Sequence, residues 1–283
     1  MLGYIITIAI LLRLYNSVAF FLVKRRIRGS AKVTPGSEPF SYKRGNKVAL
    51  LIHGFTSTPK ETSRLANFLQ RQGISISAPL LPGHGTSPER LAIVKYPEWI
   101  GHIKREIKKL EKEYAEIYII GNSFGGNIAL ILANFSKKIK GIITLGTPIL
   151  FAHERISRYI LLPILKRIKL FQRKVYKAEG IELLMQKRCN SYLSVPIRSV
   201  VQFARVIDLS KAALPSIKKP LFVVQSREDT ITKVESAQFI LNNVKSKEKS
   251  YLAIKKSYHN VLVDKVNPAM NQKILEFILK NRT

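Results

Sequence analysis

Short apolar runs alternate with longer helical patterns from residue 47 onward, and this alternation restricts the fold more than any other feature of the chain. Residues 47–53, 117–120 and 139–145 are rich in Ile, Leu and Val, which is typical of strands buried on both faces. Strands of this kind that alternate with helices form a mostly parallel sheet covered on both sides. The sequence therefore predicts an α/β fold with a mostly parallel central sheet flanked by helices.

Further predicted elements continue the alternation. Three more strands are predicted over residues 74–78, 221–225 and 249–254, and helices over residues 97–114, 124–135, 233–244 and 267–280. Another helix is expected to begin near Thr58, because Pro59 suits the first helical position and Glu61 completes the spacing of a capping box.

The N-terminal residues 2–23 form an apolar run interrupted by one charged residue, Arg13. As a helix this run would be about 33 Å long, while the hydrocarbon core of a bilayer is about 30 Å thick. A central Arg costs about 2.5–3.5 kcal/mol on insertion, which makes the span a marginal one. The run is followed by the basic residues Lys24, Arg25, Arg26 and Arg28. By the positive-inside rule, we expect a single-pass N-terminal membrane anchor over residues 1–28, with the rest of the chain in the cytoplasm.

Two other interpretations of this N-terminal segment stay open. Ser17, Val18 and Ala19 loosely resemble a signal-peptide cleavage site, although the apolar run continues beyond them and a basic start is missing. A helix lying in the membrane interface is the second alternative. Residues 29–46 are rich in Ser, Gly, Pro and Lys, as a linker or an irregular edge segment would be, so we expect the main domain over residues 47–283.

The chain is strongly basic. Lys and Arg number 48 against 18 Asp and Glu, which gives a formal net charge of +30. Because 46% of the residues are hydrophobic, the chain is not a basic disordered tail. Such an excess suits an anionic membrane, nucleic acid or an acidic partner. No nucleic-acid-binding motif is recognisable, so we expect contact with an anionic membrane surface rather than with nucleic acid.

Metal and cofactor signatures are missing from the sequence. The single cysteine, Cys189, excludes an intrachain disulfide and a cysteine-based zinc site. The five histidines are spread along the chain without an HExxH pattern. No Walker-type or Rossmann glycine fingerprint is present. We therefore expect neither a metal nor a cofactor.

The strongest chemical signature is GNSFG at residues 121–125, a G-x-S-x-G motif. It directly follows a predicted strand and leads straight into a predicted helix. A serine on such a sharp turn is held in a strained backbone conformation that exposes its hydroxyl at the carboxyl end of the sheet. The flanking glycines are required because side chains there would clash with the neighbouring strand and helix. This context predicts that Ser123 is a nucleophile.

A serine nucleophile needs a base and an acid that orients the base, in the chain order Ser, acid, His. His259 lies in a loop between a strand and the last helix, whereas His153 comes too early in the chain. Asp229 follows a strand and is the predicted acid, and the adjacent Glu228 is its main rival. Asp208 and Asp264 are poorer candidates for the acid, because Asp208 lies in the segment before that strand and Asp264 lies beyond the base in the chain.

The reaction also needs backbone N–H groups that stabilise the developing oxyanion. One is expected from Phe124, directly after the nucleophile. The other is expected from the loop after the first core strand, at Phe55. His53, in the same loop, is interpreted mainly as a structural histidine.

Several motifs together resemble the α/β-hydrolase fold superfamily. They are HGF at residues 53–55, LPGHGTSP at 81–88, GNSFGG at 121–126, SREDTIT at 226–232 and SYHN at 257–260. The resemblance covers about residues 47–283 and is greatest to bacterial carboxylesterases and monoacylglycerol-lipase-like enzymes. It implies Ser123 as nucleophile, Asp229 as acid, His259 as base, and Phe55 and Phe124 as oxyanion donors.

Two positions depart from the pattern of that superfamily. Ser226 stands where the acid loop often has glycine, and Tyr258 precedes the histidine where glycine is usual, so Tyr258 would narrow the pocket near the base. The resemblance also implies an inserted cap at about residues 150–219, where Ile, Leu and Phe pair with Arg and Lys at helical spacings. A basic amphipathic cap of this kind suits either a membrane surface or packing over the catalytic domain.

These features lead us to expect a membrane-tethered serine hydrolase that cleaves carboxylic esters through an acyl-enzyme on Ser123, with monoacylglycerol or lysolipid-like substrates favoured. A thioesterase, an amidase or a peptidase of the same fold is one alternative. A non-catalytic scaffold that uses the same fold to bind an anionic membrane or an acidic partner is another.

Overall fold

A seven-stranded sheet runs through the centre of the chain, in a computed structural model that describes residues 2–27, 32–150, 162–174, 187–255, 257–263 and 267–280. The strand order is β1-β3-β2-β4-β5-β8-β9, and only β1 pairs antiparallel. The predicted mostly parallel sheet is therefore confirmed. The strands are β1 (Phe40–Tyr42), β2 (Lys47–Ile52), β3 (Ser75–Ala78), β4 (Glu116–Asn122), β5 (Ile139–Leu145), β8 (Leu221–Ser226) and β9 (Lys249–Ile254).

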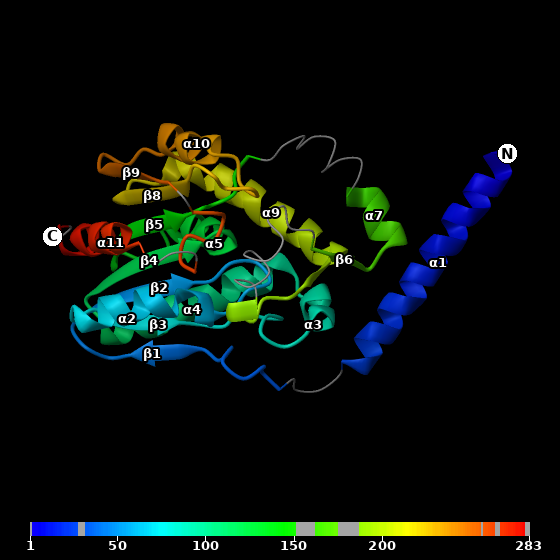
Figure 1. The fold of residues 1–283 in the computed structure, drawn as a ribbon, viewed down its shortest axis with the longest axis horizontal. Coiled ribbons are helices and arrows are strands. Elements are labelled where there is room, and N and C mark those ends of the chain that lie inside the picture. The colour runs from blue at the N-terminus through cyan, green and yellow to red at the C-terminus, as the bar shows by residue number, and fades with distance from the viewer. Residues whose placement is uncertain are drawn as a thin grey trace.

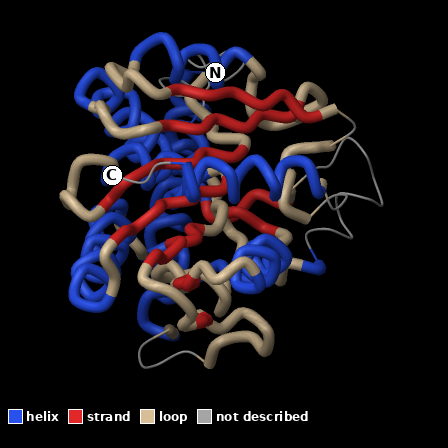
Figure 2. The backbone as a smooth tube through the Cα atoms, turned by 90° about the vertical axis from the view of Figure 1, so that its left-hand side faces the viewer, coloured by secondary structure: helices blue, strands red, loops and turns tan. Residues whose placement is uncertain are grey.

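Helices cover both faces of this sheet, as Figure 2 shows. Apolar side chains of successive strand residues point to opposite faces and build two separate cores. On one face the core includes α4 (Tyr96–Glu113), α5 (Phe124–Leu132) and α10 (Glu235–Asn243). On the other it includes α2 (Ser63–Arg71) and α11 (Pro268–Lys280). This burial on both faces is why the strands read as continuous apolar runs.

The region between β5 and β8 holds the described part of the predicted cap. It contains α7 (Leu162–Ile168), the short antiparallel pair β6 (Phe171–Arg173) and β7 (Ser194–Pro196), α9 (Ile197–Ala213) and η3 (Leu214–Ser216). Helix α9 packs against α5 and against the short helix α3 (Pro88–Ile93). It thereby connects the cap to the helix that follows Ser123. Strand β1 lies inside the segment whose composition suggested a linker or edge segment, and it pairs with β3.

The predicted membrane span is not found. In the described residues, no helix is long and apolar enough to cross a membrane. The apolar run forms α1 (Leu2–Arg26), which carries Arg13 and Asn16 in its middle. Asn16 Nδ2 donates to Lys166 O of α7 (2.8 Å), and the Arg198 guanidinium of α9 lies 3.9 Å from the centroid of the Phe20 ring. Helix α1 lies along one side of the molecule, beside α7 (Figure 1).

The predicted capping box at Thr58 does not form. The segment begins with the 3-10 helix η1 (Pro59–Thr62), and the Thr58 side chain makes no capping hydrogen bond. Thr58 Oγ1 instead donates to Cys189 O (2.8 Å), and Glu61 accepts from the N–H of Gly54. Both side chains thus bond to residues of other segments, and these hydrogen bonds take the place of the predicted local ones.

Candidate active site

Ser123 occupies the sharp turn between β4 and α5. Its backbone has φ 50° and ψ −116°, a combination that residues other than glycine rarely adopt. The strain is held by surrounding structure, since Ser123 N–H donates to Leu145 O (2.7 Å) on the neighbouring strand. The residue is 8% exposed, so the hydroxyl lies in a mostly desolvated position. This is the geometry expected for a nucleophile elbow.

The glycines around Ser123 are required by close contacts with neighbouring segments, as predicted. A Cβ on Gly121 would lie 2.3 Å from Gly125 C, and one on Gly125 would lie 2.1 Å from Ile52 O. A Cβ on Gly126 would lie 1.8 Å from Thr147 Oγ1. The turn can therefore pack against β2 and the loop after β5 only without side chains at these positions.

The structure brings Ser123, His259 and Asp229 together. His259 Nε2 lies 2.9 Å from Ser123 Oγ, and His259 Nδ1 lies 2.9 Å from each Asp229 carboxylate oxygen. They come from the ends of β4, β8 and β9, which meet at the carboxyl edge of the sheet. The N–H of His259 Nδ1 faces the carboxylate, so Nε2 is left to accept the serine proton.

The side chain of Asp229 is fully buried in a cluster of donors. Its oxygens accept from the N–H groups of Ile231 (2.9 Å) and Thr232 (2.8 Å) and from Gln225 Nε2 (2.9 Å). Burial alone would raise the pKa of Asp229, but the hydrogen bond and charge of His259, together with the two backbone donors, hold the pKa below its usual value. The carboxylate is therefore kept ionised to orient the base.

The two other candidates for the acid in the described part of the chain do not join this group. Glu228 turns away and accepts from Ser257 N–H (3.2 Å), while Asp208 lies within α9. His153 and Asp264 lie outside the described residues. Of the predicted acids in the described part of the chain, Asp229 is the one that contacts His259.

The loop after β2 lies beside Ser123, because a Cβ on Gly54 would be 3.6 Å from Ser123 Cβ. Among the described residues, the N–H of Phe55 has no protein acceptor. The N–H of Phe124 is the first of α5 and has no acceptor within its helix. Both predicted oxyanion donors are therefore available to a ligand. His53 has a structural position, since its Nδ1 pairs with Gly54 O (2.9 Å) and its Nε2 accepts from Leu81 N–H (3.1 Å).

An aromatic cluster continues from these two donors. The ring of Phe55 lies 5.6 Å from that of Phe124 and 5.0 Å from that of Phe203 on α9, measured between centroids. Trp99 lies behind them, 5.0 Å from Phe124. Phe55 and Phe203 are only partly buried, whereas Trp99 and Phe124 are fully buried. Ser123 thus adjoins an apolar surface that the loop after β2, α4, α5 and α9 build together.

The two departures from the superfamily pattern lie in the acid loop and in the histidine loop. Ser226 Oγ donates to Ser257 O and accepts from Glu228 N–H (3.2 Å), so it joins the acid loop to the histidine loop. Tyr258 is half-buried directly before His259, and the narrowing of the pocket by its side chain stays a prediction.

Three polar residues around the site were not singled out as functional from the sequence: Glu61, Asn122 and Asn260. Asn122 and Asn260 directly adjoin Ser123 and His259 in the chain, which is the one signal that could have drawn attention to them. Glu61 was interpreted as a helix-capping residue, and no local pattern indicates its buried position beside Gly54.

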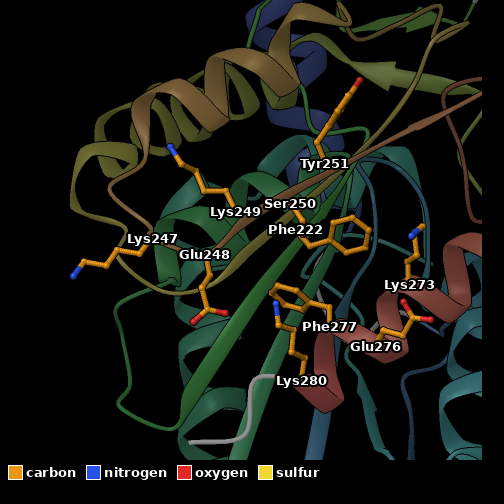
Figure 3. A pocket seen from close by; sticks show the side chains of 10 residues that line it. All are labelled: Phe222, Lys247, Glu248, Lys249, Ser250, Tyr251, Lys273, Glu276, Phe277 and Lys280. Atoms are coloured by element: carbon orange, nitrogen blue, oxygen red, sulfur yellow. The ribbon is translucent and has the colours of Figure 1, made fainter.

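A cavity of about 480 Å³ lies elsewhere, between β8, β9 and α11 (Figure 3). Phe222 and Phe277 face each other in it, while Lys247 and Lys249 extend away from the rings. Lys249 begins β9, so this cavity is at the amino end of the strand, and His259 follows the other end. None of its lining residues belongs to the group around Ser123.

Fold and site together define a serine hydrolase of the α/β-hydrolase class. Residues 44–266 match a family model described as "Serine aminopeptidase, S33", and the chain belongs to this family. It is 30% identical over 249 residues to a carboxylesterase of Bacillus subtilis (strain 168), covering 88% of this chain and 98% of that one. It is 27% identical over 257 residues to a thermostable monoacylglycerol lipase of Bacillus sp. (strain H-257), covering 88% and 97%.

Solved structures agree with this assignment. A structure reported for the metagenome-derived lipolytic enzymes LipS and LipT superposes with a TM-score of 0.78 at 25% identity, covering 88% of this chain and all of that one. The monoacylglycerol lipase of Paleococcus ferrophilus superposes with a TM-score of 0.71 at 19% identity, covering 87% and 100%, and supports the fold alone. The predicted resemblance to carboxylesterases and monoacylglycerol-lipase-like enzymes is confirmed, and the chain is a serine hydrolase of that type.

Proposed function

We propose that this protein is a membrane-associated ester hydrolase that works through an acyl-enzyme on Ser123, with monoacylglycerols or lysolipid-like esters as substrates. The observation that carries the proposal is the alignment of Ser123 Oγ, the His259 ring and the Asp229 carboxylate, each 2.9 Å from the next. This arrangement makes an otherwise weak hydroxyl nucleophilic.

In the first half-reaction, Ser123 Oγ attacks the ester carbonyl carbon while His259 Nε2 takes the hydroxyl proton. Asp229 stabilises the resulting imidazolium, and the N–H groups of Phe55 and Phe124 stabilise the oxyanion. The carbonyl re-forms, the bond to the leaving oxygen breaks, and His259 gives its proton to the departing alcohol. The acyl group is then bonded to Ser123 Oγ.

In the second half-reaction, His259 removes a proton from water, and the water oxygen attacks the acyl carbon. The second oxyanion forms at the same two N–H groups. It collapses by breaking the bond to Ser123 Oγ, which regains its proton from His259. A carboxylic acid and the free enzyme result, so one ester and one water are consumed in each cycle.

The apolar surroundings support a substrate with an acyl chain. The partly buried rings of Phe55 and Phe203 adjoin the oxyanion donors and offer a hydrocarbon tail a surface away from water. The relatives are named carboxylesterase and monoacylglycerol lipase, which agrees with such a substrate. We therefore favour a long-chain ester over a short-chain one.

The proposed membrane association rests on α1. Large apolar side chains are exposed around this helix, with Ile8 at 56%, Leu11 at 59% and Leu14 at 56%. Lys24 and Arg25 follow at its end, and basic residues next to an apolar helix favour anionic headgroups by about 1 kcal/mol each. We propose that α1 attaches the enzyme to the anionic cytoplasmic face of a membrane.

Replacing Ser123 by Ala tests the proposed chemistry. The wild-type chain should hydrolyse p-nitrophenyl esters and monoacylglycerols and react with a fluorophosphonate probe, while Ser123→Ala should lose labelling and at least about 10³-fold in kcat. The other predicted hydrolase activities are assayed beside these with thioester and aminoacyl-amide substrates. A wild-type chain that is neither labelled nor active on any ester would contradict the proposal and favour a non-catalytic scaffold.

Flotation with vesicles tests the proposed membrane association. Full-length protein should float with vesicles that contain phosphatidylglycerol, and the double substitution Leu11→Asp and Leu14→Asp should reduce the bound fraction about tenfold or more, because charges are excluded from the acyl region. Leu279→Asp, on the 38% exposed leucine of α11, is the matched control and should bind like the wild type. Equal flotation of all three proteins would refute a role for α1.

A further inference from the structure

Glu61 is a buried carboxylate that the proposed mechanism does not use. It lies in η1, is 3% exposed, and was drawn into the interior away from the capping position that its sequence context predicts. Burying a carboxylate is costly unless hydrogen bonds and charges compensate for the lost hydration. Its partners therefore indicate what it does.

Three donors surround this carboxylate. Glu61 Oε1 accepts from the N–H of Gly54 and from Asn122 Nδ2 (3.0 Å), and Glu61 Oε2 accepts from Asn260 Nδ2 (3.1 Å). Asn122 Nδ2 also lies 3.4 Å from Asn260 Oδ1, which joins the two amides to each other. All three hydrogen bonds run toward the carboxylate oxygens, which have enough lone pairs to accept them together.

Each donor stands directly beside a residue of the proposed mechanism. Gly54 precedes Phe55, the oxyanion donor of the loop after β2. Asn122 precedes Ser123, and Asn260 follows His259. The three segments are distant in the chain, and Glu61 is the side chain in which their hydrogen bonds converge.

A half-buried lysine interacts with this cluster. Lys174, next to β6, donates from Nζ to Thr56 Oγ1 (2.6 Å). Thr56 lies in the loop after β2 that also holds Gly54 and Phe55, which we call the oxyanion loop. Burial lowers the pKa of Lys174 to about 7, and the negative charge of Glu61 opposes that lowering. The carboxylate of Glu61 thus favours the charged form of the lysine.

We propose that Glu61 is a positioning residue that fixes the oxyanion loop, the turn that holds Ser123 and the loop that holds His259 relative to one another. This inference rests on the proposed ester hydrolysis. Misplacing catalytic groups by about 1 Å costs on the order of 100-fold in rate. Loss of the Glu61 bonds should therefore appear in the chemical step rather than in substrate binding, which takes place along the aromatic cluster.

Glu61→Gln is the sharpest single change because it keeps the size of the side chain. Its oxygen still accepts from Gly54 and Asn122, but its amide now faces the amide donor of Asn260. We expect kcat to fall roughly 10- to 100-fold, with KM within about threefold of the wild-type value. Fluorophosphonate should still label the variant completely, at a rate reduced in proportion to kcat.

A compensating substitution separates positioning from general damage. Asn260→Asp alone places two carboxylates against each other and should lower kcat at least as much as Glu61→Gln. In the double variant, the amide introduced by Glu61→Gln would donate to the carboxylate introduced by Asn260→Asp, so kcat should recover to within about fivefold of wild type. Each kcat is taken at the plateau of that variant's pH profile, because a carboxylate beside His259 changes the profile.

Glu116→Gln is the matched control for loss of a partly buried, bonded carboxylate. Glu116 pairs with Lys47 Nζ and accepts from Tyr118 OH (2.9 Å) at the amino end of β4, away from the site. The Glu116→Gln variant should have a lower Tm than the wild type and an unchanged kcat. Wild-type kcat in Glu61→Gln, or failure of the double variant to recover, would overturn the inference while ester hydrolysis by the wild type stands. A wild-type chain that neither reacts with fluorophosphonate nor cleaves esters would overturn the proposed function and this inference with it.

Discussion

At the scale of single residues, this site depends on backbone geometry as much as on reactive side chains. Ser123 is held at φ 50° because Gly121, Gly125 and Gly126 let the turn approach β2 and Thr147. The strain at one residue is thus maintained by close packing at three others. We expect substitutions at these glycines to affect the fold before they affect the chemistry.

Gly125→Ala tests this dependence. The new Cβ would meet the backbone at Ile52 O at 2.1 Å, which no side-chain rotation relieves, so we expect a loss of roughly 3 kcal/mol or more in the free energy of unfolding. Gly101→Ala, within α4, is the matched control, since its Cβ would meet only Arg105 Nη1 at 3.5 Å. It should gain about 0.5–1 kcal/mol. Urea unfolding of both variants measures the difference, and similar stabilities would contradict the steric explanation.

At the scale of elements, α9 and α1 connect regions that are distant in the chain. Helix α9 packs on α5 and supplies Phe203 to the aromatic cluster beside the oxyanion donors. Helix α1 contacts α7, and its Phe20 ring meets Arg198 of α9. The described part of the cap therefore touches both the N-terminal helix and the proposed acyl-binding surface.

Phe203→Ala tests whether α9 contributes to substrate preference. Loss of the ring removes apolar contact for a long acyl chain, so kcat/KM for decanoyl esters should fall about tenfold while that for acetyl esters stays within about twofold. Phe68→Ala, on a partly buried ring of α2 that packs on the opposite core, is the control. It should lower Tm without changing the ratio of the two kcat/KM values. An unchanged ratio in Phe203→Ala would exclude this surface as the acyl site.

At the scale of the whole molecule, two buried histidines tie stability to pH. Burial and the charge of neighbouring His84 hold the pKa of His53 well below its usual value, against the hydrogen bond to Gly54. Burial likewise lowers the pKa of His84 to about 4, although the Pro82 and Leu81 carbonyls oppose this. Both rings stay neutral in the folded state when the unfolded chain, with histidine pKa values of about 6.5, already takes up protons. The stability that these two neutral rings contribute is therefore present above about pH 6.5 and is lost as the pH falls toward 4.

His84→Asn measures this effect. Between pH 7 and pH 5, His84 lowers the free energy of unfolding of the wild type by about 2 kcal/mol, so the variant should lose about 2 kcal/mol less over this interval. Asn keeps a donor for Pro82 O, the partner of His84 Nδ1. Asp229 does not interfere, because its lowered pKa contributes stability that is lost only below about pH 4. Urea unfolding at the two pH values measures the loss in the free energy of unfolding for each protein. Equal losses in the wild type and in His84→Asn would refute the proposed role of His84.

The sequence by itself determined the sheet, because apolar runs buried on both faces are visible without tertiary information. The predicted limits of β5 and β9 agree with the structure, and those of β2 and β8 differ by one residue. The strand–turn–helix context of GNSFG likewise located the sharp turn, since glycine spacing there follows from local sterics. The prediction of Ser123, Asp229 and His259 needed only their order and their positions at strand ends.

The tertiary structure decided what depends on partners distant in the chain. It placed Asp229 rather than Glu228 against His259, a choice between adjacent residues that the loop conformation makes. It turned Glu61 from a predicted cap into the common hydrogen-bond acceptor of three segments, and it added β1 to the sheet. Local patterns report the periodicity of apolar residues and the face to which each side chain points. Which hydrogen-bond donor a buried carboxylate meets is set by packing between segments, and this packing exists only in the folded chain.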